Sequence, residues 1–238
     1  KGLANSSDNI SNNPNVSQLQ CSGCPGGRTT IGTGSTSSLA CVVVIQVPTS
    51  GIAAAFAGAS DGAWIKMIPG TLNTWDGLEE AGQALLSLFN KWVVISCGGS
   101  NDDDCTWSGG GSRRIVTLYN CPEGTTVFSH ITFRDGSVTG NYHGGALDVR
   151  NTRCKVIICR FVNNQVSRRG GAISTYGTAS AHGLAQVDLF GCYFSGNSAS
   201  ASWGGGDDIE RSTGNIVSVS GCPSGKKLVL ASEFEITS

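Results

Sequence analysis

The sequence predicts an all-β protein, a right-handed parallel β-helix with an N-terminal capping α-helix and disulfide bonds. Three observations predict this fold. A unit of short strands and glycine turns recurs through the second half of the chain. The full sequence contains 34 glycines, which suit a chain that turns often. Its ten cysteines point to cross-linking in an oxidising compartment.

The internal repeat consists of a phenylalanine followed by a run of glycines. Its three copies carry Phe133, Phe161 and Phe194, each followed in turn by a glycine pair that begins at Gly144, Gly170 and Gly204. The unequal intervals indicate that loops vary in length while the strands keep their register. Because such short strands bury nothing alone, we expect successive coils to stack about 4.8 Å apart around a shared interior.

Stacking gives each repeated residue a structural role. The three phenylalanines are expected to superpose as an internal aromatic ladder, each ring lying over the next. Asn164 and Asn197 each follow a phenylalanine by three residues, and we expect them to form an amide ladder at a turn. Gly136 interrupts that series in the first copy.

The chain divides into three parts. Residues 1–40 are polar and turn-rich and are expected to form an N-terminal arm, whereas residues 93–238 form the β-helix. Between them, residues 41–92 hold a buried strand at 41–47 and apolar residues with helical spacing at 73–92. A helix there is placed to cover the open edge of the first coil, although a packed surface helix is the alternative.

The cysteines are expected to form disulfides rather than a metal site. Cys21 and Cys24 form a CxxC pair, but no second pair and no histidines at metal-binding spacing accompany them. Cys159 and Cys192 occupy equivalent positions on neighbouring coils, so they form either a disulfide or a stack of buried thiols. The disulfide candidates are Cys21, Cys24, Cys41, Cys97, Cys105, Cys121, Cys154, Cys159, Cys192 and Cys222.

The acidic loop at 101–104 lies between Cys97 and Cys105. A solvated loop closed by a disulfide between these two cysteines is the favoured interpretation. Calcium binding by its carboxylates is the alternative, but the loop lacks the spacing of an EF-hand.

Several features bear on location and partners. Asn5, Asn9 and Asn15 each begin an Asn-x-Ser sequon, so we expect glycosylation of the arm. With the cysteines, the sequons favour a secreted protein, extracellular or at the cell surface. The chain begins with Lys1 rather than Met, which suggests removal of a targeting segment. A net charge of −1 argues against nucleic-acid binding, and no apolar run is long enough to span a bilayer.

The repeated tetrapeptides resemble a known family. The motifs are Gly144-Gly-Ala-Leu147, Gly170-Gly-Ala-Ile173, Phe161-Val-Asn-Asn164 and Phe194-Ser-Gly-Asn197. They are similar to the Gly-Gly-Ala-Ile/Leu/Val and Phe-x-x-Asn tetrapeptides of chlamydial polymorphic outer-membrane proteins. The resemblance covers about residues 115–222, and its outer copies depart from it at 133–136 and 204–207. It implies a pectin-lyase-like β-helix of the kind used for surface display and adhesion.

Two functions follow from these observations. The favoured one is a non-enzymatic structural or adhesive module, with other protein chains or glycans as partners. Self-association through the ends of the β-helix is also expected if an edge is left open. No cofactor is expected, because the sequence carries no phosphate-binding or nucleophile motif.

The alternative function is a polysaccharide-active enzyme, an inverting glycoside hydrolase or a lyase. If Leu147 and Val149 point inward, the alternation of a strand turns Asp148 outward. It also places Arg150, Ser174, Tyr176, Asp208 and Glu210 on that same outer face. Asp148 and Asp208 then lie two coils apart, near the upper end of the carboxylate separation of inverting enzymes. The other motifs of β-helix polysaccharide hydrolases are incomplete, so solvated carboxylates are the default, and a one-residue change of register sends Asp208 inward.

Overall fold

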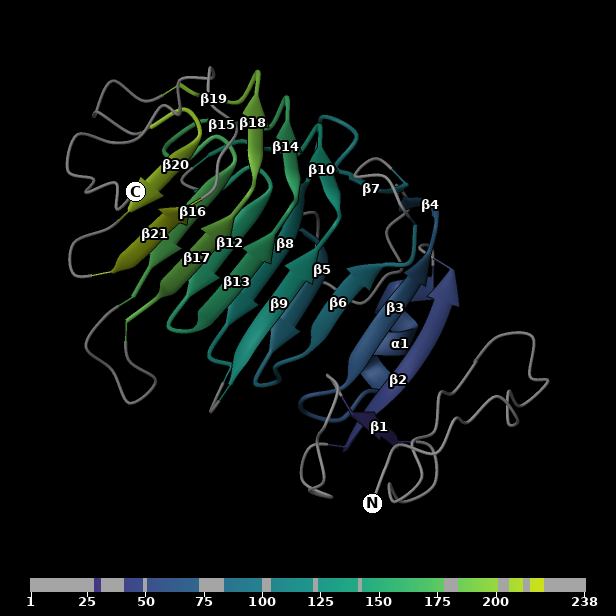
Figure 1. Cartoon of the computed structure of the whole chain (residues 1–238). Helices are drawn as coiled ribbons and strands as arrows, with labels where there is room; N and C mark the ends of the chain where they lie inside the picture. The colour runs from purple at the N-terminus through teal and green to yellow at the C-terminus, as the bar shows by residue number, and fades with distance from the viewer. Residues whose placement is uncertain are drawn as a thin grey trace.

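The computed structural model describes residues 28–30, 41–48, 51–72, 84–99, 104–121, 124–140, 143–177, 184–200, 206–211 and 215–220. These residues form a right-handed parallel β-helix, as the sequence predicts (Figure 1). Apart from the antiparallel pair β1–β2 at the N-terminal end, the described strands pair in parallel with the strands one coil before and after them. Coil therefore stacks on coil along the whole described solenoid.

The N-terminal part builds the first coils with three strands each. It begins with β1 (Arg28–Thr30), β2 (Cys41–Pro48) and α1 (Ile52–Gly58). The first coil contains β3 (Trp64–Ile68), β4 (Gly70–Leu72) and β5 (Ala84–Phe89). The next contains β6 (Val94–Cys97), β7 (Cys105–Ser108) and β8 (Arg114–Tyr119).

Later coils add a short fourth strand. They are β9 (Thr125–Ser129), β10 (Thr132–Arg134), β11 (Ser137–Val138) and β12 (Leu147–Arg150); β13 (Arg153–Ile157), β14 (Arg160–Val162), β15 (Gln165–Val166) and β16 (Ile173–Tyr176); and β17 (Gln186–Phe190), β18 (Tyr193–Ser195), β19 (Ser198–Ala199) and β20 (Ile209–Arg211). The last described strand is β21 (Ile216–Ser220).

Four sheets run along the solenoid and form its faces. Sheet 1 contains β1, β2, β3, β6, β9, β13, β17 and β21, and sheet 2 contains β4, β7, β10, β14 and β18. Sheet 3 contains β11, β15 and β19, and sheet 4 contains β5, β8, β12, β16 and β20. Alternate side chains of each strand point inward, where one continuous apolar core runs from Ile52 to Val219.

The predicted aromatic ladder is confirmed. Phe133 pairs in register with Phe161, and Phe161 with Phe194. The ring centroids lie 5.0 and 4.9 Å apart, with interplanar angles of 13° and 9°. Trp107 continues the column by one coil, with its ring edge-on to Phe133 at 5.4 Å. The column therefore helps to hold neighbouring coils in register through side-chain packing.

The predicted amide ladder is also confirmed. The Asn164 side chain donates from Nδ2 to the Asn197 Oδ1 at 2.9 Å and to the Phe133 carbonyl at 3.1 Å. Asn197 repeats the second bond one coil later, to the carbonyl of Phe161. Gly136 ends the series because a Cβ there would lie 2.3 Å from the Gly145 carbonyl, and its N–H donates to the Asn164 Oδ1 instead.

The paired glycines of the repeat have two different roles. Gly144 and Gly170 adopt φ of +66° and +67°, a left-handed conformation that glycine tolerates best. A Cβ on Gly145 would lie 2.3 Å from the Gly171 carbonyl of the next coil. The first glycine therefore makes the turn, and the second lets neighbouring coils approach.

The predicted helix at 73–92 is wrong over residues 84–89, which form β5; residues 73–83 lie outside the described residues. Leu86 and Leu88 pair in register with Val116 and Leu118 of β8, and both leucines are buried. A leucine-rich stretch satisfies both the helical and the strand period, and pairing with the next coil decides between them.

The helix at the N-terminal end is instead α1, which lies beside β2 and β3 (Figure 1). Ile52 and Ala53 of this helix are buried in the core. Lys91 donates to the carbonyls of Phe56 and Ala57, where the helix ends and a cation is favourable. Among the described residues, no helix is both long and apolar enough to cross a bilayer.

The expected disulfide between Cys97 and Cys105 is present and joins the end of β6 to the start of β7. Cys159 and Cys192 do not form a disulfide, because each thiol donates to a backbone carbonyl instead. Cys121 and Cys154 are buried thiols that form no disulfide, and burial raises the pKa of both. Of the remaining candidates, Cys21, Cys24, Cys222 and the Cys41 side chain lie outside the described residues.

The amide ladder predicts the effect of a conservative substitution. Asn164→Asp keeps an acceptor for the Gly136 N–H but places a buried carboxylate against the Phe133 carbonyl and the Asn197 Oδ1. We expect a loss of about 2–5 kcal/mol in the free energy of unfolding, measured by urea denaturation. Asn163→Asp, at an exposed neighbouring position, is the matched control and should change it by less than about 0.5 kcal/mol. Equal effects of the two substitutions would contradict the ladder.

Candidate functional site

The candidate site is the outer face of sheet 4, where the sequence places its outward-pointing residues. Leu147 and Val149 of β12 are fully buried in the core, so Asp148 and Arg150 lie on the opposite face. The register of sheet 4 arranges that face in two rows. We call one the polar row, which contains Ser87, Thr117, Asp148, Ser174 and Glu210, and the other the aromatic row, which contains Phe89, Tyr119, Arg150 and Tyr176.

The expectation that Asp208 shares the outer face with Asp148 is wrong. Ile209 pairs with Ile173, so Glu210 rather than Asp208 continues the row of Asp148. Asp208 is buried, and its Oδ1 accepts a hydrogen bond of 2.8 Å from Asn197 Nδ2. Its carboxylate extends the amide ladder by one group, so the structure does not bring the two aspartates together as a catalytic pair.

The Asp148 carboxylate is fully buried between two arginines. Its Oδ2 accepts from Arg150 Nη2 at 2.6 Å and lies 3.2 Å from Arg114 Nη1. Arg114 is itself buried and donates to the backbone carbonyls of His143 and Gly144. These bonds tie the polar row to the loop that carries the first glycine pair.

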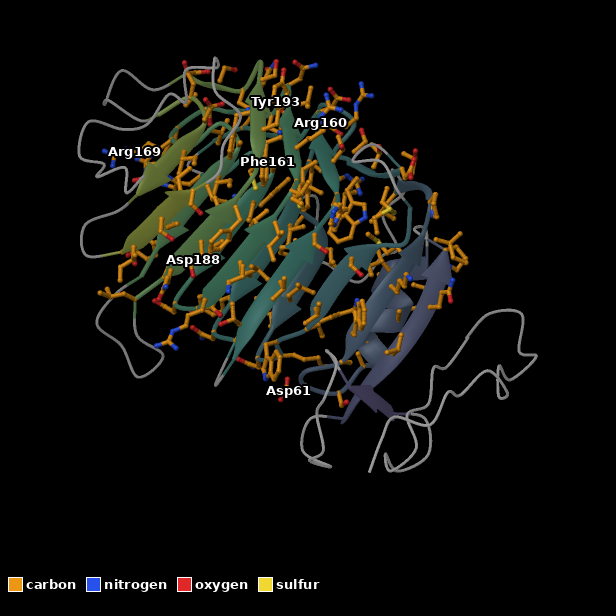
Figure 2. All side chains as sticks on the ribbon, in the orientation of Figure 1. Asp61, Arg160, Phe161, Arg169, Asp188 and Tyr193 are labelled. Atoms are coloured by element: carbon orange, nitrogen blue, oxygen red, sulfur yellow. A yellow bond between two sulfur atoms is a disulfide. The ribbon has the colours of Figure 1, made fainter. Side chains whose placement is uncertain are left out.

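The second carboxylate of the polar row, Glu210, is also buried and paired. Glu210 is 2 % exposed, accepts a hydrogen bond of 2.9 Å from Ser174 Oγ and lies 3.5 Å from Arg169 Nη1. Figure 2 labels Arg169 at the C-terminal side of the molecule, where its side chain is partly exposed. Neither carboxylate of the row is open to a polymeric substrate.

His143 lies against this buried charge cluster. Its Nδ1 is buried and, among the described residues, has no hydrogen-bond partner; the same holds for the Asp148 Oδ1. Burial lowers the pKa of His143 below its usual value of 6.5, and Arg168 and Arg169 lower it further, while Glu210 and Asp148 oppose the shift. The folded protein therefore favours a neutral imidazole at this position.

The aromatic row is exposed. Phe89, Tyr119 and Tyr176 are 49, 36 and 51 % exposed, and the Arg150 side chain is 35 % exposed. Phe89 lies edge-on to Tyr119 with ring centroids 5.9 Å apart, and Arg150 occupies the position between Tyr119 and Tyr176. Three of the four exposed aromatic side chains of the described residues are in this row, so it differs from the rest of the surface.

A row of asparagines, which the sequence did not lead us to expect, borders the aromatic row. Asn90, Asn120 and Asn151 each follow a residue of the aromatic row and adopt φ near +50°. The Asn151 Nδ2 donates to the Asn120 Oδ1 at 3.2 Å. The sequence does contain a signal for this row: asparagine recurs directly after an outward aromatic or arginine residue. Asparagine is suited to these turns because it tolerates the left-handed conformation.

Two aromatic residues on the other faces lie in separate cation–π pairs. Lys155 lies over the exposed Phe190 ring on sheet 1, at 5.4 Å. Arg160 lies over Tyr193 on sheet 2, and Figure 2 labels the two side by side. Within the described part of the chain, no cluster of His, Cys, Asp or Glu could hold a metal ion.

Comparison with known families agrees with this architecture. The Chlamydia polymorphic membrane protein repeat matches residues 158–176, which contain β14, β15 and β16. Residues 158–176 are a repeat of this type. The matched polymorphic membrane protein repeat spans Phe161 to Asn164 and the glycine pair at Gly170, so the two tetrapeptides of the resemblance lie inside it. No curated protein and no solved structure matches the chain.

The half-buried imidazole of His143 predicts a pH dependence of stability. Because the pKa of His143 is lower in the folded state than its usual value, its contribution is complete above about pH 6.5 and is lost as the pH falls through the folded pKa. His143→Gln should therefore reduce the fall in unfolding free energy between about pH 7.5 and about pH 5, measured by urea denaturation. An identical fall in both proteins would show that His143 is not held neutral.

Proposed function

We propose that the chain is a non-enzymatic, adhesin-like β-helix module that binds other macromolecules through the aromatic row of sheet 4. The observation that carries this proposal is the line of exposed Phe89, Tyr119, Arg150 and Tyr176 on a rigid solenoid face. The polymorphic membrane protein repeat and the β-helix fold fit a surface module of this kind. Tyrosine and arginine are also the residue types enriched where binding energy concentrates.

Burial of the polar row supports binding rather than catalysis. Asp148 and Glu210 are each buried and paired with arginine, so their charges are balanced within the protein. A general acid or base must come within hydrogen-bond reach of its substrate. Asp208 has a structural partner in Asn197, so no observation favours the alternative of a polysaccharide-active enzyme.

We further propose that the module acts outside the cell or at the cell surface. The disulfide between Cys97 and Cys105 suits an oxidising compartment. Glycans at Asn5, Asn9 and Asn15 would fit the same location, and these residues lie outside the described part of the chain. Association through the β-helix ends also stays a prediction, since residues 221–238 are not described.

The proposed function predicts that substitutions in the aromatic row reduce cell adhesion. Beads coated with the chain are expected to bind fixed epithelial cell monolayers, and the Tyr119→Ala/Tyr176→Ala variant should bind at least about fivefold fewer, because it removes two rings of the aromatic row. Bound beads are counted by fluorescence after washing, and circular dichroism and thermal unfolding verify that each variant is folded.

Phe190→Ala is the matched control, because Phe190 is an exposed ring on sheet 1 and lies outside the row. It should bind as the unmodified chain does. Equal binding by the tyrosine double variant, or no binding by the unmodified chain to any of a panel of cells and extracellular matrices, would contradict the proposed function.

A further inference from the structure

The geometry of the aromatic row points to a ligand class: we infer that the row binds a polysaccharide in which neutral sugars alternate with carboxylate-bearing sugars. Sugar rings pack against the exposed Phe89, Tyr119 and Tyr176 side chains, and the Arg150 guanidinium pairs with a carboxylate of the polymer. This inference rests on the proposed function and specifies its ligand.

The shape of the row favours a linear polymer over a protein surface. The row is one side chain wide and spans about 14 Å, because its four members lie on successive strands about 4.8 Å apart. A stable protein interface buries about 800 Å² on each partner around an apolar centre. Here the polar row borders the aromatic row on one side and the asparagines border it on the other. No second rank of exposed apolar side chains widens the row within the described part of sheet 4.

The chemistry of the row matches the two surfaces of a sugar. A pyranose ring has an apolar C–H face that packs against an aromatic ring and a rim of hydroxyl groups that needs hydrogen bonds. Tyr119 and Tyr176 supply both a ring face and a hydroxyl group. The half-buried amide of Asn120, beside the row, adds a polar group at its edge.

Arg150 sets the charge and the spacing of the ligand. Its Nε and Nη2 both donate to the Asp148 Oδ2, which holds the guanidinium in place and leaves Nη1 uncommitted among the described contacts. A planar guanidinium recognises a carboxylate through paired N–H donors. The row offers one cation in four positions, whereas densely sulfated polymers are bound by clusters of Lys and Arg. A polymer in which some but not all sugars carry a carboxylate therefore fits best.

Pre-organisation strengthens this fit. The buried Asp148 carboxylate fixes Arg150, and the stacked coils fix the spacing of the rings, so little conformational entropy is lost when a ligand binds. Among the described residues, the ion pairs of this face join three arginines, Arg114, Arg150 and Arg169, to two carboxylates, Asp148 and Glu210, so this cluster has one more positive charge than negative. The local field thus favours an anionic occupant although the whole chain has a net charge of −1.

Calorimetric titration of the folded chain with defined oligosaccharides tests the inference. The probe is a hyaluronan octasaccharide, in which a carboxylate-bearing sugar alternates with a neutral one. Chitin oligosaccharides of the same length are neutral, polygalacturonate oligomers carry a carboxylate on every sugar, and heparin oligomers are densely sulfated. Hyaluronan should bind at least about tenfold more tightly than each of the other three.

Substitutions then locate the binding. Tyr119→Ala and Tyr176→Ala should each weaken hyaluronan binding at least about tenfold, since each removes the ring against which a sugar packs. Arg150→Lys keeps the charge beside Asp148 but removes the planar fork, and it should weaken binding about threefold to tenfold. Phe190→Ala, with its ring on sheet 1, should leave the affinity within about twofold.

The outcomes separate this inference from the proposed function. If the native chain binds no oligosaccharide, while its cell binding depends on Tyr119 and Tyr176 and is abolished by protease treatment of the cells, the ligand is a protein and the inference is overturned. Tighter binding of heparin, polygalacturonate or chitin oligosaccharides also overturns it, as does hyaluronan binding that survives both tyrosine substitutions. If the native chain binds no cells at all, the proposed adhesin-like function itself is overturned.

Discussion

In-register stacking of successive coils is the constraint on which the rest of the structure depends. Each coil contributes a ring to the column of Phe133, Phe161 and Phe194 and, in the later coils, an asparagine amide to the ladder beside it. The rings restrict sliding through packing, and the amides restrict it through bonds that no water can replace in the buried turn. A slip of one residue would turn every core side chain outward, so the same contacts that stabilise the core also fix what each outer face presents.

The outer face of sheet 4 shows how this constraint separates structural from binding roles. The two rows lie two residues apart on each strand, yet one is buried and charge-paired and the other is exposed. Arg150 connects the two rows, because it pairs with the buried Asp148 while it lies in register between Tyr119 and Tyr176. Burying a charge in the polar row costs free energy unless an opposite charge compensates it. The Arg150 guanidinium that compensates Asp148 is thereby held in one position, which favours recognition of a ligand.

Sequence reasoning succeeded where a residue's role depends on the repeat and failed where it depends on neighbours in space. The phenylalanine and asparagine ladders recur at matching positions, so stacking alone predicts them. The strand at Ala84–Phe89 was predicted as a helix because its leucines satisfy both periods, and only pairing with β8 decides between them. Asp208 was misplaced because the variable loop before it hides the register, which is set by the pairing of Ile209 with Ile173.

The same distinction explains what the sequence indicated about the candidate site. Alternation within β12 correctly turned Asp148 and Arg150 outward, but it did not indicate that Asp148 would be buried between Arg150 of its own strand and Arg114 of β8. The row of Phe89, Tyr119, Arg150 and Tyr176 needs the register of four strands, one of which was predicted as a helix. The asparagines beside it carried a sequence signal that becomes clear only once those strands are aligned.

The most direct test of the account is a nuclear Overhauser experiment on protein with selectively labelled phenylalanine rings. Stacking of coils in register requires contacts between the Phe133 and Phe161 rings and between the Phe161 and Phe194 rings, whose centroids lie about 5 Å apart. Phe133 and Phe194, two coils apart, should show no direct contact. A contact between those two rings, or the absence of both neighbouring contacts, would contradict the stacked column and the outer faces that it fixes.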